Sequence, residues 1–147
     1  MTLLDAYAVV AFLIDEPASE EVEAILDAGG ARVVVVNLAE AVDVTQRVHD
    51  LARDDVRAAV EPLLLSNVLA SAISEEAHGW LAASIRTTYY DKQTAAVSTA
   101  DCFLLAHAAA DGGPIATADP SVASIARDMN IDVTALPDSA GARPNTA

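Results

Sequence analysis

The chain has 147 residues, 53% of them hydrophobic, which fits one folded domain with a substantial core. The formal net charge of −14 argues against passive binding of nucleic acid by a basic surface, and it favours a basic partner. The single cysteine, Cys102, excludes an intrachain disulfide, and the longest early apolar run, residues 6–14, is too short for a membrane span of about 20 residues. Because no basic signal-peptide segment precedes that run, we expect a cytoplasmic protein without a membrane segment.

The N-terminal part of the chain alternates short apolar runs with longer helical segments. Pro17 ends the first helical segment, and Gly29-Gly30 ends the second. The β-branched run at residues 32–36 is typical of a strand buried on both faces of a parallel sheet. In chain order we expect a strand at residues 2–4, helices at 6–14 and 19–28, a strand at 32–36, and a long helical stretch from Asn37 to about Ala59 that breaks near residues 53–55 and leaves Pro62 beyond it.

The C-terminal part continues the same alternation. We expect a short strand at residues 68–73, a helix from Ser74-Glu75-Glu76 to about Tyr90, a polar loop at 91–97, a helix at 101–110, a strand at 114–117, a helix from Asp119 to Asn130, and a last strand at 131–136. This order predicts one α/β domain over residues 1–136, with a parallel sheet flanked by helices on both faces. Residues 137–147 are predicted to form a disordered tail.

Four acids lie just after a predicted strand or at the start of a predicted helix: Asp5, Glu40, Asp101 and Asp119. Each alone can be a helix cap; Asn37 to Glu40 and Ser98 to Asp101 have the spacing of capping boxes. In a parallel sheet, however, such junctions meet at the carboxyl edge, where ligands bind. Clustered carboxylates raise one another's pKa and need a counter-ion. Oxygen ligands of this kind suit Mg²⁺ or Mn²⁺.

The segments around these acids resemble the PIN-domain ribonucleases, and within them the VapC-type toxins of bacterial toxin–antitoxin pairs. The matching segments are LLDAYAVVAFLIDEP, VVVVNLAEAVDV, VSTADCFLLAHAAADGG and PIATADPSVASIA. The resemblance implies a five-stranded parallel sheet and hydrolysis of RNA with Mg²⁺ or Mn²⁺. It also implies a cognate antitoxin that blocks the site, and a homodimer.

The same resemblance assigns roles to individual residues. It implies that Asp5, Glu40, Asp101 and Asp119 form the catalytic and metal-binding quartet. It further implies that Thr117 hydrogen-bonds a carboxylate and that Asn37 helps set the turn before Glu40. Two features depart from the family pattern: Pro120 stands where a basic residue often follows the last Asp, and the chain carries less positive charge than many such toxins.

For several other residues the sequence allows two interpretations, one functional and one structural. Asp43 shares a helix face with Glu40 and either extends the acidic site or is solvated. The basic residues Arg47, Arg53 and Arg57 contact RNA or an antitoxin, or form ion pairs with Asp50, Asp54 and Asp55. The aromatic residues Trp80, Tyr89 and Tyr90 stack on bases, or pack in a core or dimer interface.

The remaining candidates favour structural roles. Asp91 is interpreted as a loop acid. His49, His78 and His107 lack a metal-ligand spacing such as HxxxH and are interpreted as structural or surface residues. Cys102 is interpreted as a small buried residue rather than a nucleophile.

The leading hypothesis is therefore a metal-dependent endoribonuclease, the toxin of a toxin–antitoxin pair whose antitoxin has a basic tail. The alternative is a binding or scaffold protein of the same fold, whose acidic pocket accepts basic peptides without catalysis. A phosphoryl-transfer enzyme of receiver or haloacid-dehalogenase type is disfavoured. The only lysine is Lys92, no acidic pair follows the first strand, and no second Asp follows Asp5 by two residues.

Overall fold

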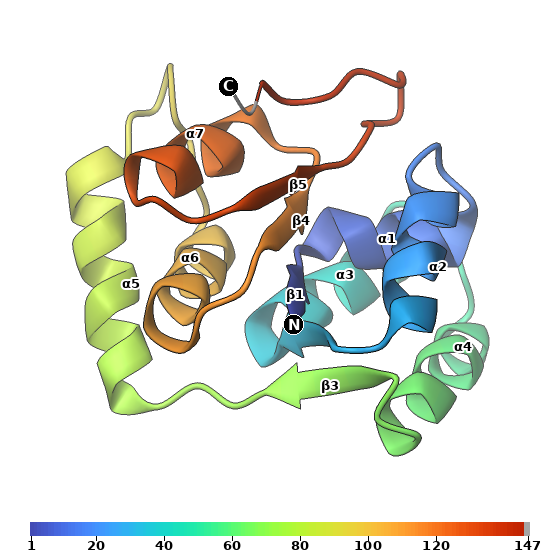
Figure 1. Ribbon diagram of the computed structural model, residues 1–147. Coiled ribbons are helices and arrows are strands. Elements are labelled where there is room, and N and C mark those ends of the chain that lie inside the picture. The colour runs from blue at the N-terminus through green and yellow to red at the C-terminus, as the bar shows by residue number, and fades with distance from the viewer. Residues whose placement is uncertain (146–147) are drawn as a thin grey trace.

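The computed structural model describes residues 1–145 and contains a five-stranded sheet in which every neighbouring pair is parallel (Figure 1). The strand order is β3-β2-β1-β4-β5, so the first strand of the chain lies at the centre. The strands are β1 (Thr2–Leu4), β2 (Ala31–Val34), β3 (Leu69–Ala72), β4 (Ile115–Thr117) and β5 (Val133–Ala135). The predicted α/β class and five-stranded parallel sheet are confirmed.

Helices cover both faces of this sheet (Figure 1). The helices are α1 (Ala6–Ile14), α2 (Ser19–Ala28), α3 (Val35–Arg47), α4 (Arg53–Leu65), α5 (Glu76–Tyr89), α6 (Thr99–Asp111) and α7 (Pro120–Asp128). None of these helices is long and apolar enough to cross a membrane, within the residues described.

Alternation along each strand divides the core into two clusters, because successive strand residues point to opposite faces. Leu3 and Ile115 pack on one face with residues of α5, α6 and α7. Leu4 and Ala116 pack on the other face with residues of α1, α2 and α3. All four of these strand side chains are at most 1% exposed. The register of β1 against β4 therefore supports both halves of the core.

The strand order creates a switch point beside the central strand. From β1 the chain moves outward through β2 to β3, and then returns to form β4 on the other side of β1. The loops that follow β1 and β4 consequently leave the sheet in different directions. In open α/β sheets a crevice forms outside the carboxyl ends of the strands at such a point. The topology predicts a site between the ends of β1 and β4.

The boundary between β2 and α3 differs from the sequence prediction. The strand ends at Val34 and the helix begins at Val35, so three of the five residues of the predicted strand at 32–36 remain in a strand. Val34 pairs with Ala72, the last residue of β3, and the ladder ends there. Asn37 consequently lies inside the first turn of α3. The predicted capping box from Asn37 to Glu40 is wrong, because the residue at the helix N-cap is Val34.

The predicted long helix from Asn37 to about Ala59 is two helices. The break lies at residues 48–52, before the predicted break at 53–55. Helix α4 also continues through Pro62 to Leu65, so the prediction that Pro62 lies beyond the helix is wrong. Leu63 and Leu64 pack against the core beneath them, and this contact favours the final turn despite the proline.

Residues 137–145 pack against the body of the domain. The hydroxyl of Tyr7 donates a hydrogen bond to the carbonyl of Pro137, at 3.1 Å. The guanidinium of Arg143 pairs with Glu21 of α2 and donates to the carbonyl of Ala135, at 2.6 Å. The disordered tail predicted for residues 137–147 is therefore not what the structure describes over 137–145. Residues 146 and 147 lie outside the described part of the chain.

Candidate active site

The four acids singled out in the sequence come from four different helix beginnings. Asp5 follows β1 and is the N-cap of α1, and Asp119 follows β4 and is the N-cap of α7. Asp101 lies in the first turn of α6. Glu40 lies in the second turn of α3, the helix that begins where β2 ends. Asp5 and Asp119 therefore flank the switch point between β1 and β4.

Electrostatic effects link the four carboxylates in pairs. Asp101 and Asp119 both raise the pKa of Asp5. Asp119 also raises the pKa of Asp101, and Asp101 raises the pKa of Glu40. Because such effects decay over about a Debye length, each of the four acids lies near at least one other. We call this group the acidic quartet.

Asp5 is the most deeply buried member of the acidic quartet, at 4% exposure. Burial is the main reason that its pKa rises to about 7, and the neighbouring Asp101 and Asp119 add to that rise. Two hydrogen bonds oppose it, one from the Thr117 side chain and one from the backbone N–H of Ala8, at 2.6 Å. Removal of the carboxylate from water thus outweighs the hydrogen bonds that stabilise its charge.

Thr117 connects two members of the quartet. Its side chain is fully buried and hydrogen-bonds the carboxylate of Asp5. Its hydroxyl oxygen accepts the backbone N–H of Asp119, at 3.0 Å. The expectation that Thr117 hydrogen-bonds a carboxylate agrees with this arrangement. One hydroxyl at the end of β4 therefore fixes Asp5 relative to the loop that carries Asp119.

Three of the acids cap helices and still keep a second carboxylate oxygen outside the cap. Asp5 uses Oδ1 for the N–H of Ala8, and Asp119 uses Oδ1 for the N–H groups of Ser121 and Val122. Asp101 uses Oδ2 for the N–H of Ser98, in the predicted capping box. Capping and ligand binding are therefore compatible in the same side chain, since each cap occupies one oxygen and orients the other.

Burial raises the pKa of Asp101 and of Glu40, and burial is the largest cause for each. For Asp101 the hydrogen bonds from Ser98 act in the opposite direction. For Glu40, Asp101 and Asp43 add to the rise. Glu40 is thus the quartet member that is desolvated without the support of a capping bond.

Asn37 is an unusual neighbour of Glu40, one helical turn away on α3. Its side chain is fully buried, and neither its amide nitrogen nor its amide oxygen has a hydrogen-bond partner among the described residues. Buried polar groups are hydrogen-bonded in the great majority of proteins. The expected role of Asn37 in a turn before Glu40 is wrong, since no turn separates β2 from α3. The amide of Asn37 is therefore an unsatisfied buried polar group one helical turn from Glu40.

Most of the other polar candidates have ordinary surface roles. Asp43 is exposed and pairs with Arg47, at 2.8 Å, rather than joining the quartet through a buried contact. Arg57 pairs with Glu61, at 2.6 Å. Arg47 and Arg57 therefore form ion pairs, but the predicted partners Asp50, Asp54 and Asp55 are wrong for both of them. Asp91 accepts backbone N–H groups within its own loop, as a loop acid does.

Sequence reasoning missed a second polar cluster, which lies at the C-terminal end of α6. His78, His107 and Asp111 bring one ligand atom each within 4.8 Å of one another. The two imidazole rings are stacked, with centroids 3.9 Å apart and an interplanar angle of 11°. Asp111 also pairs with Arg32. The four-residue spacing of His107 and Asp111 on one helix was a signal for this cluster that the sequence analysis did not use.

The hydrogen bonds of this cluster favour a polar link between α5 and α6 over a metal site. The backbone N–H of Glu75 donates to Nδ1 of His78, so the neutral ring carries its proton on Nε2, which lies 3.4 Å from Asp111. Ser74 lies 2.9 Å from Nε2 of His107, whose Nδ1 lies 3.0 Å from Asp111. With Ser74 donating, both nitrogens that face Asp111 carry protons rather than free lone pairs.

Comparisons with known proteins agree with this fold. A family model described as the PIN domain matches residues 2–128. Among solved structures, the chain is similar to the crystal structure of FitAcB from Neisseria gonorrhoeae, with a TM-score of 0.59 and 22% sequence identity. That alignment covers 90% of this chain and 96% of the other. No curated protein sequence matches the chain significantly.

Proposed function

Since the chain belongs to the PIN domain family, we propose that it is a metal-dependent endoribonuclease that hydrolyses RNA phosphodiester bonds as the toxin of a toxin–antitoxin pair. One observation carries this proposal. Four carboxylates from separate parts of the chain lie at the N-cap or in the first two turns of four helices, and each is electrostatically linked to at least one other. Such a cluster is costly in a folded protein unless a cation offsets its charge.

The chemistry of the acidic quartet fits a hard divalent cation. Mg²⁺ prefers oxygen ligands and retains several waters, and Mn²⁺ accepts the same ligand set. Asp5, Glu40, Asp101 and Asp119 would hold the ion, and the buried amide of Asn37 offers a further polar group near Glu40. When bound, the ion lowers the pKa of water and offsets the charge that develops on the phosphoryl oxygens.

The residues of this chain supply orientation around that ion. The caps of α1, α6 and α7 each fix one carboxylate oxygen of Asp5, Asp101 and Asp119. Thr117 fixes Asp5 relative to Asp119. Glu40 has no such restraint, and in this proposal its carboxylate accepts the proton of the attacking water. Three acids held by capping bonds and a fourth without one suit a site that must hold an ion and also move a proton.

The proposed partners follow from charge and from exposed apolar side chains. A net charge of −14 favours an antitoxin with a basic tail, which would cover the acidic quartet. Val35, Ile73 and Trp80 are large apolar side chains that are 51%, 79% and 73% exposed. We assign them to the interface of a homodimer, since exposed apolar side chains of this size are enriched at such surfaces. The proposed location is the cytoplasm.

The proposal predicts cleavage of RNA by the purified protein with Mg²⁺ or Mn²⁺, and no cleavage after EDTA is added. Asp5→Asn and Glu40→Gln should each reduce cleavage by roughly a hundredfold or more, because each removes a charged ligand. Asp43→Asn is the matched control for Glu40→Gln. It neutralises an exposed acid on the same helix and should leave the rate unchanged. Equal cleavage by wild type and Asp5→Asn would contradict the assignment.

A second candidate is a binding protein whose acidic pocket accepts basic peptides without catalysis. The excess of 22 acidic over 8 basic residues favours it. This reading predicts tight binding of a basic peptide in EDTA and no metal-dependent cleavage of any RNA. A titration of Mn²⁺ onto the protein separates the two candidates, since the nuclease requires binding that Asp5→Asn abolishes.

A further inference from the structure

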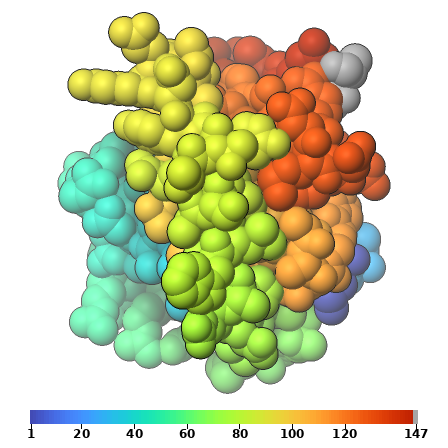
Figure 2. Space-filling view, turned by 90° about the vertical axis from the view of Figure 1, so that its left-hand side faces the viewer, coloured from blue at the N-terminus to red at the C-terminus, as the bar shows by residue number. Residues whose placement is uncertain are grey.

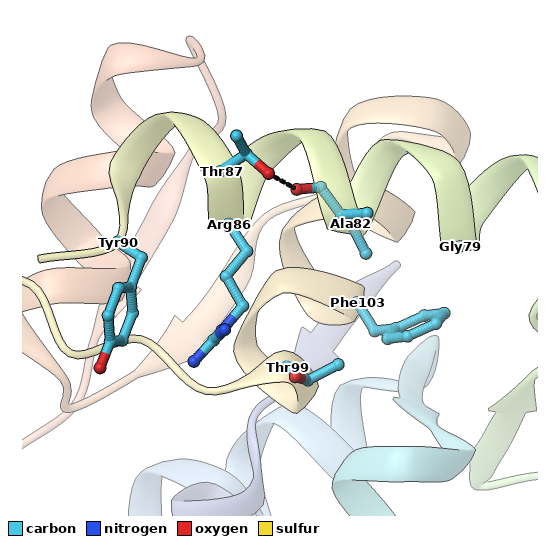
Figure 3. Close-up of a pocket in the computed structure, with 8 residues that line it drawn as sticks. Gly79, Ala82, Arg86, Thr87, Tyr90, Thr99 and Phe103 are labelled. Carbon is cyan, nitrogen blue, oxygen red and sulfur yellow. Dashed lines mark hydrogen bonds between the residues drawn. The ribbon is translucent and has the colours of Figure 1, made fainter.

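A cavity of about 450 Å³ lies between α5 and the N-terminal part of α6. We call it the α5–α6 groove; its lining includes Ala82, Arg86, Thr87, Tyr90, Thr99 and Phe103. In Figure 3 the side chain of Arg86 projects from α5 between the ring of Tyr90 and the side chain of Phe103, above Thr99 of α6. Figure 2 shows that α5 lies at the surface over its whole length, so the groove is accessible from outside.

Arg86 is a cation without a carboxylate partner among residues 1–145. Its guanidinium lies 4.4 Å from the centroid of the Tyr90 ring, and its Nε donates to the carbonyl of Val97, at 3.3 Å. Four other arginines form ion pairs with acids: Arg32, Arg47, Arg57 and Arg143. In a chain of net charge −14, an arginine held in a groove by an aromatic ring and a carbonyl keeps its charge for an external anion.

Arg86 also contacts the segment that leads to one member of the acidic quartet. Val97, which accepts its Nε bond, immediately precedes Ser98, and Ser98 forms the capping box that holds Asp101. A phosphate bound by this guanidinium would therefore lie near the beginning of α6, where Asp101 is held.

We propose that the α5–α6 groove binds one nucleotide of single-stranded RNA next to the bond that is cut, with its phosphate on Arg86. The inference rests on the proposed function and names a substrate subsite for it. The guanidinium keeps nitrogens beyond Nε that suit a phosphate. The rings of Phe103 and Tyr90 offer apolar surface for a base. Of the three aromatic residues considered for stacking in the sequence, only Tyr90 lines this groove.

The first test uses Arg86→Gln and Arg86→Lys, with binding of a fluorescein-labelled single-stranded RNA followed by anisotropy over a series of NaCl concentrations. Loss of one charge-assisted bond should weaken binding about tenfold. A plot of log affinity against log salt concentration has a negative slope, and loss of one phosphate contact should reduce the magnitude of that slope by about 0.7. Arg86→Lys keeps the charge and should keep the slope. Arg53→Gln, at an exposed arginine of α4, should change neither quantity.

The second test leaves Arg86 and its bond to Val97 intact. Thr87→Glu places a negative charge at the rim of the groove, and Thr88→Glu places it outside the lining. The two threonines are matched, since both are exposed and each donates its hydroxyl to the carbonyl four residues earlier, at 2.9 Å. Thr87→Glu should weaken RNA binding several-fold more than Thr88→Glu, with similar melting temperatures for both variants.

The inference is overturned if Thr87→Glu and Thr88→Glu bind RNA equally, or if Arg86→Gln keeps the wild-type salt slope. Cleavage assays on the same proteins separate this result from a failure of the proposed function. A wild type that cleaves RNA with metal, together with an unchanged salt slope in Arg86→Gln, supports the nuclease and rejects the groove. A wild type that binds RNA through Arg86 and never cleaves it rejects the nuclease and supports the groove.

Discussion

Asp5 shows most clearly that burying and clustering carboxylates destabilises their charged form. Its carboxylate is buried, and two neighbouring acids face it, so its pKa rises to about 7 despite two hydrogen bonds. An ordinary aspartate has a pKa near 3.9. Between about pH 4 and pH 7 the folded, metal-free protein therefore binds a proton at Asp5 that the unfolded chain releases. The stability of the metal-free protein falls as the pH rises through this window.

Asp5→Asn removes this titration while it preserves the local structure, since asparagine is as good an N-cap as aspartate. In EDTA, the variant should be more stable than wild type at pH 8, by up to about 4 kcal/mol at about 1.4 kcal/mol per unit of pKa shift. At pH 4 the difference should largely vanish, because Asp5 is then protonated in the folded state and about half protonated in the unfolded chain. Urea unfolding at the two pH values measures this difference. A variant that is less stable than wild type at pH 8 would refute the raised pKa.

Thr117 should control metal binding through Asp5. Thr117→Val removes the side-chain hydrogen bond that lowers the pKa of Asp5, and it leaves the N–H of Asp119 without its acceptor. We expect Mn²⁺ affinity at pH 7 to fall several-fold, because a larger fraction of Asp5 is then protonated. The loss should shrink at pH 8.5. Calorimetric titration measures it, and Thr117→Ser, which keeps the hydroxyl, should behave as wild type if the hydrogen bond is responsible.

At the scale of elements, the same capping hydrogen bonds stabilise the helices and orient the acids of the quartet. Ser98→Ala removes the hydroxyl that accepts the N–H of Asp101, and it should lower the free energy of unfolding by about 1 kcal/mol. Ser84→Ala is the control, because Ser84 is an exposed residue in the middle of α5 where alanine is well tolerated. Denaturant unfolding distinguishes them. Equal stability of the two variants would show that the capping box contributes nothing.

The helix and strand types were predictable because the hydrophobic runs and glycine stops are strong local signals. The end of β2 was not, because Val35 and Val36 are β-branched and favour a strand locally. The ladder ends where its neighbour β3 ends, at the pairing of Val34 with Ala72, and that limit is set by tertiary structure. The same error misplaced Asn37 as a cap. Tertiary packing also extended α4 through Pro62.

The acidic quartet stays a prediction for the functional site, and it does not depend on exact element boundaries. Strand-to-helix junctions of a parallel sheet meet at one edge wherever the strands end, so the two misplaced elements do not affect it. The stacked pair of His78 and His107 was not foreseen, since it depends on α5 lying against α6. The α5–α6 groove depends on the same contact. Pairwise helix packing is the part of this fold that periodicity alone leaves undetermined.

At the scale of the whole molecule, the acidic quartet and the net charge act together. Mg²⁺ or Mn²⁺ should raise the melting temperature of wild type, because an ion that binds only the folded state stabilises it by about 2.7 kcal/mol at a hundred times its dissociation constant. NaCl at equal ionic strength is the necessary control, since any salt screens the repulsion of a −14 chain. Differential scanning fluorimetry measures both shifts. Asp5→Asn should lose the specific shift and keep the NaCl effect.

The central position of β1 has a consequence for the order in which the chain is made. Leu3 and Leu4 pair with Ile115 and Ala116 of β4, across a separation of more than a hundred residues. Domains form from the N-terminus during synthesis at about 5–20 residues per second, and contacts of such separation close last. A nascent chain that has emerged only as far as Asp101 lacks β4, Thr117 and Asp119. If the acidic quartet is the nuclease site, the ribosome making this protein is exposed to its activity only after β4 and the loop that carries Asp119 have been synthesised.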